Sequence, residues 1–328
     1  MKNFIKVSVL VVFAIISLFA FTGCEKDSPV ADPSALLQQS IYNLFEVSSL
    51  RYDAVLSADV SSVSVGGDVS ADFNLNGAFN HTAEKKSNFE MNAVADLKDK
   101  DSKEYKVDFS MKEISDKVYV QLLEAPQIPG LATDGFKDFV GPWWQIDTTQ
   151  LGAMGDNLGT LDTLGASESE LDESGKKKRQ LLLTSNFFDD VEYGGTEDVG
   201  GSPAYVFDVS LDKEGVVEYL KGLAEIGGQT PTAEEEADLV AGLSAIDFDG
   251  DVYVDIATSV LVKVNGEFML TDPSSGERST VDTDFSVSDL NKPFEIKEPT
   301  DFKVFDLGAF FGAFLGAGMT SGVDAAVK

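Results

Sequence analysis

Histidine and cysteine, on which many catalytic and metal sites depend, are almost absent from this chain. Its 328 residues include one histidine, His81, and one cysteine, Cys24. A single histidine excludes a multi-histidine metal site, and a single cysteine excludes a disulfide within the chain. No nucleophile elbow and no phosphate-binding glycine loop accompany them. We therefore predict that the protein is not an enzyme and carries no metal or cofactor.

Basic residues are also scarce. The chain has 25 lysines and arginines against 56 aspartates and glutamates, a formal net charge of -31 at pH 7. Because like charges repel, we expect no binding to nucleic acid, and no binding to anionic headgroups over most of the surface. The exception is a basic cluster at residues 176–179. It is interpreted either as a solvated helix face or as a contact with an anionic headgroup or a partner protein.

The N-terminus has the layout of an export signal. Lys2 and Lys6 precede an apolar run over residues 7–21, which ends in Thr22-Gly23-Cys24. The run is shorter than the roughly 20 residues that a membrane-spanning helix needs.

This layout resembles a bacterial lipoprotein signal peptide. The resemblance implies removal of residues 1–23 and attachment of a diacylglycerol to Cys24, with residues 24–31 as a tether. The protein would then be lipid-anchored at the extracytoplasmic face of the cell membrane. The alternatives are an ordinary secretory peptide and an uncleaved N-terminal anchor.

Beyond the tether, the apolar residues change their period. Asp32-Pro33 is typical of a helix start, and the apolar residues that follow it up to Phe45 recur at helical spacing. From Leu50 onward apolar and polar residues alternate, which is typical of strands that expose one face to solvent and bury the other. Strands are predicted at residues 50–60, 69–79, 89–97, 105–111, 118–122, 191–199, 205–211, 246–256, 260–270 and 280–287. Further helices are predicted within residues 167–190, 212–226 and 232–243.

This order predicts an α+β fold with about ten or eleven antiparallel strands in one domain, residues 32–304. A sheet with one apolar face must be covered by a second sheet, by closing on itself, or by helices, and the inserted helices favour the third arrangement. Residues 305–328 form an apolar, glycine-rich tail. The tail is predicted either to dock on the body of the protein or plug its groove, or to touch a membrane or a partner.

Several stretches, taken in order, resemble the lipoprotein-carrier superfamily of LolA/LolB-like and LppX/LprG-type proteins. They are residues 35–52, 143–147, 201–209, 254–263 and 291–299. The resemblance implies a strongly curved antiparallel sheet, a half-barrel, with helices lying in its concave side. It also implies a hydrophobic cavity that holds the acyl chains of a lipid or lipoprotein.

The candidate ligand-binding residues are large apolar side chains predicted to face inward. They are Phe73, Phe89, Met91, Phe109 and Met111, together with Trp143 and Trp144 from a stretch that carries the resemblance. Small residues such as Ala54 and Ala95 are interspersed with them and would leave room for a ligand. The competing interpretation is a packed core, with helices filling that room, in a structural or interaction lipoprotein that meets another envelope protein through its acidic surface.

Residues 247–251 alternate three aspartates with Phe248 and Gly250. Carboxylates suit calcium, but the run does not match an EF-hand loop. The outer face of a strand explains the alternation.

Overall fold

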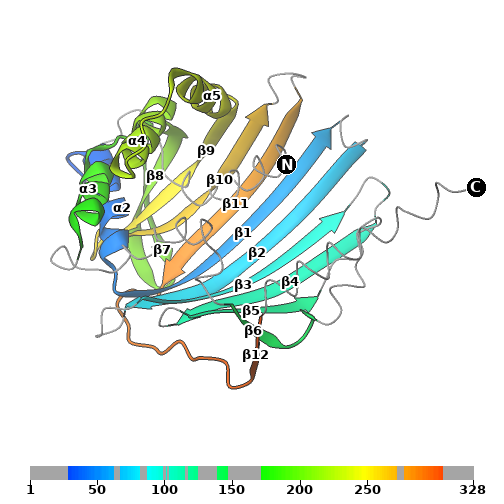
Figure 1. Cartoon of the computed structure of the whole chain (residues 1–328). Coiled ribbons are helices and arrows are strands. Elements are labelled where there is room, and N and C mark those ends of the chain that lie inside the picture. Colours follow the sequence, from blue (N-terminus) through cyan, green and yellow to red (C-terminus); the bar gives the residue numbers. More distant parts are fainter. Residues whose placement is uncertain are drawn as a thin grey trace, which may run out of the picture.

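The computed structural model describes residues 29–62, 67–81, 87–98, 101, 103–114, 117–124, 139–146, 171–271 and 277–305. The predicted signal peptide, Cys24 and the tail beyond residue 305 lie outside the described residues. Within the described part, twelve strands form one open sheet, and four helices lie against it (Figure 1).

The strand order is β12-β6-β5-β4-β3-β2-β1-β11-β10-β9-β8-β7. The first half of the chain supplies β1 (Ser49–Ser62), β2 (Gly67–His81), β3 (Ser87–Lys98), β4 (Glu104–Ile114), β5 (Lys117–Glu124) and β6 (Trp143–Ile146). The second half supplies β7 (Phe188–Val199), β8 (Ser202–Leu211), β9 (Ile246–Asp255), β10 (Leu261–Thr271), β11 (Arg278–Ser288) and β12 (Phe302–Val304). All neighbours pair antiparallel except β12 and β6, which are parallel.

The pairing register gathers apolar side chains on one face of the sheet, which we call the inner face. A continuous cross-strand row on this face contains Val252, Val264, Phe285, Ala54, Leu75, Ala93 and Phe109, from β9 to β4. Because successive side chains of a strand point to opposite faces, the polar residues between them form the outer face.

The helices begin at residues that can cap them. In α2 (Pro33–Glu46), α3 (Glu173–Thr184) and α4 (Lys213–Ile226), the caps Asp32, Asp172 and Asp212 accept a backbone N–H three residues ahead. Thr232 and Glu235 form a capping box at the start of α5 (Ala233–Ser244).

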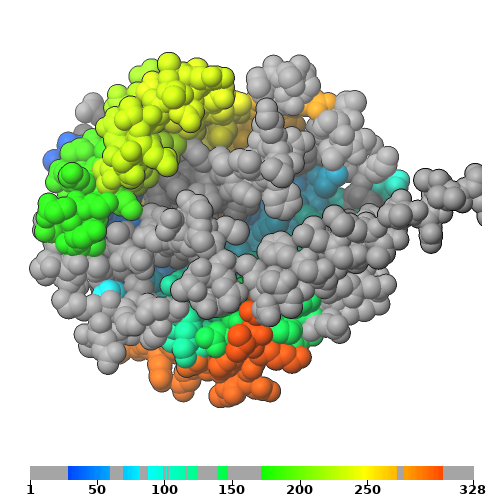
Figure 2. All heavy atoms as spheres, in the orientation of Figure 1, coloured from blue at the N-terminus to red at the C-terminus, as the bar shows by residue number. Residues whose placement is uncertain are grey.

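These helices cover the inner face of only one half of the sheet. Among the described residues, the principal helix contacts with strands are made by α2 with β7 and β10 and by α5 with β9. The shared core is apolar: it includes Leu37, Ile41, Val216, Tyr219 and Leu243 from helices and Phe207, Val252, Val264 and Phe268 from strands. In Figure 2 the helices form one side of the molecule, in green and yellow, and the end of the described chain, in orange, lies on another.

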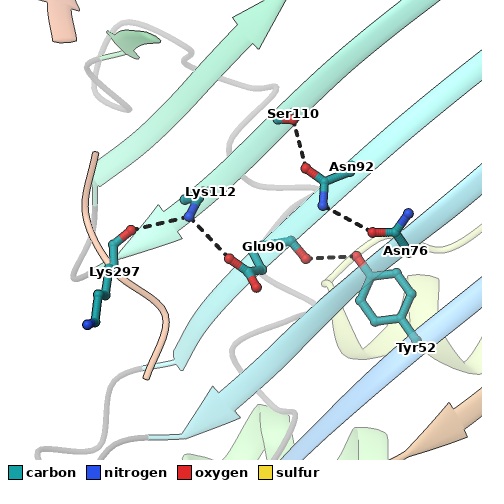
Figure 3. A network of polar contacts seen from close by, with 7 residues as sticks. All are labelled: Tyr52, Asn76, Glu90, Asn92, Ser110, Lys112 and Lys297. Carbon is teal, nitrogen blue, oxygen red and sulfur yellow. Dashed lines mark hydrogen bonds and ion pairs between the residues drawn. The ribbon is translucent and has the colours of Figure 1, made fainter. Parts of the chain in front are cut away.

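Residues 289–301, the crossing segment, connect β11 to β12 across the outer face of β1–β5 (Figure 1). The backbone N–H of Asn291 donates to the Ser49 carbonyl at 2.8 Å, and the Asn80 amide donates to the Phe294 carbonyl at 2.9 Å. At β4, Lys112 donates to the Lys297 carbonyl and pairs with Glu90 at 3.2 Å (Figure 3). With Lys117 and Tyr119 of β5, which both donate to the Glu298 carboxylate, the segment is bonded to four strands, β1, β2, β4 and β5, on the outer face.

The predicted fold class is confirmed: the sheet is curved, open and largely antiparallel, and helices lie on its inner face (Figure 1). Two short strands, β6 and β12, add to the ten predicted segments. The helix predicted within residues 167–190 is shorter in the structure, because α3 ends at Thr184 and β7 begins at Phe188.

Candidate ligand surface

The candidate surface is the inner face of β1–β5, where no described helix makes a principal contact. Phe73, Met91, Phe109 and Met111 all lie on this face and are half-buried. Met91 and Met111 are direct cross-strand partners on β3 and β4. The sheet thus brings four of the predicted residues together on three neighbouring strands.

Large and small side chains alternate across this surface. Phe73 pairs with Ala95, and Phe109 pairs with Ala93. Ala58 pairs with Ala71 in the neighbouring register. Each phenylalanine ring therefore has a methyl group as its partner on one side, while on the other side Phe73 pairs with Leu56 and Phe109 pairs with Leu122. The small partners are the feature that the sequence predicts for a surface with room for a ligand.

Phe89 lies on the same face, near the end of β3, and stacks on Tyr52 with ring centroids 5.9 Å apart. The Tyr52 hydroxyl crosses Gly77 and donates to the Glu90 carbonyl at 3.0 Å (Figure 3). A Cβ at position 77 would overlap both of these oxygen atoms. Burial, with a smaller contribution from the Glu90 carboxylate, raises the pKa of Tyr52. This tyrosine was not among the predicted site residues, although a glycine inside an alternating strand is a signal for such a close approach.

The two predicted tryptophans lie on opposite faces. Trp144 pairs with Val120, which pairs with Met111, so Trp144 belongs to the inner face. Its indole N–H donates to the Phe139 carbonyl at 3.2 Å, and its ring packs against Phe139 and Phe305.

Trp143, the preceding residue, lies on the outer face, where the Lys112 ammonium is 5.7 Å from its ring centroid. We therefore leave Trp143 out of the ligand surface.

The residues of the basic cluster at 176–179 make different contacts. Arg179 is buried and pairs with Glu46 of α2 at 3.1 Å, so this residue joins two helices. Lys176 makes a local pair with Glu173. Beside the cluster, Lys177, Leu181 and Gly222 line a hollow of about 500 Å³ between α3 and α4.

The aspartates of residues 247–251 lie on the outer face of β9, while Phe248 between them is buried in the core. Burial raises the pKa of Asp251, and the neighbouring carboxylates of Asp208, Glu197 and Asp249 raise it further. In the described part of the chain, no group of three or more potential ligand residues could hold a metal ion. None of the described helices has the length and apolar character needed to cross a membrane.

No family model matches the chain, and no curated protein matches it. Among solved structures it is similar to the lipoprotein LppX of Mycobacterium tuberculosis, with 15% identity, a TM-score of 0.31, and coverage of 81% of this chain and 100% of that one. LprF of Mycobacterium bovis follows with 11% identity, a TM-score of 0.34, and coverage of 82% and 98%.

A third similar structure is the MucA/MucB complex of Pseudomonas aeruginosa, with 10% identity, a TM-score of 0.27, and coverage of 83% of this chain and 64% of that one.

Proposed function

We propose that the protein is a lipid-anchored lipoprotein of the extracytoplasmic membrane face that binds or carries acyl chains on the inner face of β1–β5. The observation that carries this proposal is the continuity of the inner face. One apolar row runs from Val252, under the helices, to Phe109, away from their principal contacts. Apolar side chains that remain half-buried are an unfavourable surface in water, and acyl chains are a chemically matched cover.

The shape of the surface supports a flexible apolar ligand. Phe73 and Phe109 each have an alanine as one of their two cross-strand partners, so the face is lower on one side of each ring. The side chains of Met91 and Met111, which adapt easily to irregular partners, lie between them. The inner-face side chains of this row carry no charge, which suits hydrocarbon and excludes a highly charged ligand.

The anchor is the second part of the proposal. Cys24 ends an export-type segment and is the only thiol of the chain. A single acyl chain gives only marginal and reversible membrane binding. A diacylglycerol at Cys24 carries two chains and would therefore hold the protein stably at the membrane.

A second candidate function is that of an interaction lipoprotein with a packed interior. The outer face of β8–β11 favours it, because carboxylates there stand directly opposite one another. Asp208 pairs with Asp251, and Glu267 lies between Asp249 and Asp282. Like charges in these positions destabilise a sheet, and a basic surface on another envelope protein would relieve the repulsion.

Native mass spectrometry separates the two candidates. The complete sequence is expressed, purified as the cell processes it, and released from detergent in the spectrometer. The proposal predicts two signatures: a diacylglycerol mass on the chain at Cys24, and additional non-covalent acyl lipid. A lipidated chain with no bound lipid would favour the interaction lipoprotein, and an unmodified Cys24 would contradict the anchor.

A further inference from the structure

Thr283 is a buried hydroxyl on an otherwise apolar part of the inner face. It lies on β11 between Val281 and Phe285, which both pack against the core. The residue is 3% exposed. In the part of the chain that the structure describes, Thr283 Oγ1 is buried and has no hydrogen-bond partner.

An unpaired buried hydroxyl costs folding free energy, because it has left water without gaining a new hydrogen bond. Valine has the same shape and carries no such cost. Almost all buried polar groups in proteins have partners, so an exception calls for a specific explanation.

Thr283 marks the junction between the two halves of the inner face. Its cross-strand partners are Leu56 on β1 and Gly266 on β10. Gly266 in turn pairs with Gly250, and the ring of Phe248 lies so close to both glycines that an added Cβ would meet it at 2.6 and 2.9 Å. The hydroxyl is therefore a lone polar group between the helix-covered core and the proposed acyl surface.

We propose that Thr283 Oγ1 donates a hydrogen bond to an ester carbonyl oxygen of the acyl ligand. The inference rests on the proposed function, since it assigns the polar end of the ligand that the acyl surface would hold. The ligand class is a neutral acyl ester. A free fatty acid would bring a carboxylate to a site whose neighbours Leu56, Val281 and Phe285 supply no positive charge. Because the structure buries the hydroxyl, the ligand must displace apolar side chains to reach it.

The test is a competition between two ligands that differ only at the proposed acceptor. Monooleoyl glycerol has an ester carbonyl, and its 1-O-oleyl ether analogue does not. Both are added in equal amounts to the complete, detergent-purified protein. They differ in mass, so native mass spectrometry reports both complexes in one spectrum. We expect the wild-type chain to prefer the ester by about 3- to 10-fold, as one neutral hydrogen bond implies.

Three variants make the result specific. Thr283→Val should abolish the preference and raise the melting temperature of the ligand-free protein by about 2–4 °C, because it removes an unpaired polar group. Thr283→Ser keeps the hydroxyl and should keep the preference. Thr280→Val, on the outer face of the same strand, should leave the preference unchanged. If Thr283→Val does not fold, Thr283→Ala takes its place.

Failure of the inference and failure of the proposed function give different results. A wild-type chain that binds both ligands equally, or a Thr283→Val variant that still prefers the ester, would overturn the role of the hydroxyl and leave the acyl surface standing. A wild-type chain that binds neither ligand would overturn both proposals.

Discussion

The hydroxyl of Tyr52 on β1 donates to the backbone carbonyl of Glu90 on β3, at 3.0 Å, across the strand that lies between them. This is feasible because the residue beneath the ring is Gly77. The contact positions the Tyr52 ring against Phe89, on the inner face of β1–β3.

We predict that Tyr52→Phe lowers the free energy of unfolding by about 0.5–1.5 kcal/mol, since it removes one hydrogen bond and leaves the ring in place. Gly77→Ala should cost more, because the new Cβ would overlap the Glu90 carbonyl and force the ring to move. Urea unfolding measures both. Tyr193→Phe is the control, since that hydroxyl is in an exposed contact with Thr196. Equal effects at Tyr52 and Tyr193 would contradict the account.

A second prediction concerns the room on the inner face. Ala95→Phe places a second ring beside Phe73 and should reduce the fraction of purified protein that carries acyl lipid. Val94→Phe adds a ring to the outer face of the same strand and should leave lipid occupancy unchanged. Native mass spectrometry of the two purified variants gives the occupancies. Loss of lipid in both variants, or in neither, would argue against this face as the ligand surface.

The ion pair between Arg179 and Glu46 is asymmetric, and a third prediction follows from that. The Arg179 side chain is 4% exposed, whereas that of Glu46 is 45% exposed. Glu46→Ala leaves a buried guanidinium without its carboxylate partner and should cost about 1–3 kcal/mol. Arg179→Met leaves a carboxylate that water can solvate, and should cost less.

Lys176→Met is the matched control for this pair, because Lys176 contacts an exposed Glu173 on the same helix. Its effect should stay within about 0.5 kcal/mol. Thermal unfolding of the three variants tests the order. A larger cost for Arg179→Met than for Glu46→Ala would refute the asymmetry.

The Glu298 carboxylate, in the crossing segment, should make the stability of the protein depend on pH. Hydrogen bonds from Tyr119 and Lys117 to the Glu298 carboxylate lower the pKa of Glu298. A lowered carboxyl pKa stabilises the folded chain above the ordinary glutamate pKa, and this stabilisation is lost as the pH falls through the lowered value.

We therefore expect Glu298→Gln to be less stable than the wild type at pH 7, and the difference to shrink as the pH falls below about 4. Glu295→Gln is the control, because Glu295 is 78% exposed and lies 3.8 Å from Lys297. Urea unfolding at a series of pH values gives the comparison. A difference between Glu298→Gln and wild type that is independent of pH would mean that the carboxylate charge has no part in holding the segment.

The long strands could be predicted from sequence because one face of the sheet is exposed to solvent. Apolar and polar residues therefore alternate along segments such as β1 and β3. The helix starts at Asp32 and Thr232 were equally readable from their capping residues. The three-residue strand β12 has no period of its own and exists only because it pairs with β6. The crossing segment likewise depends on side chains of distant strands, including Asn80 and Lys112.

The site itself was predictable in part. Alternation alone places Phe73, Met91, Phe109 and Met111 on one face once their strands are assigned. The same rule separates Trp143 from Trp144, but it could be applied only after β6 had been recognised. Thr283 gave no signal in the sequence, since threonine is common in strands and its lack of a partner is visible only in three dimensions.

Photo-crosslinking with a diazirine-labelled monoacylglycerol tests the central claim most directly. After irradiation of the purified complex, peptide mapping by mass spectrometry locates the label. The account predicts labelling on the inner face of β2–β4, at residues such as Phe73, Met91 and Phe109, and protection by excess unlabelled ester. Label confined to outer-face residues such as Val94, or label that unlabelled ester does not displace, would contradict it.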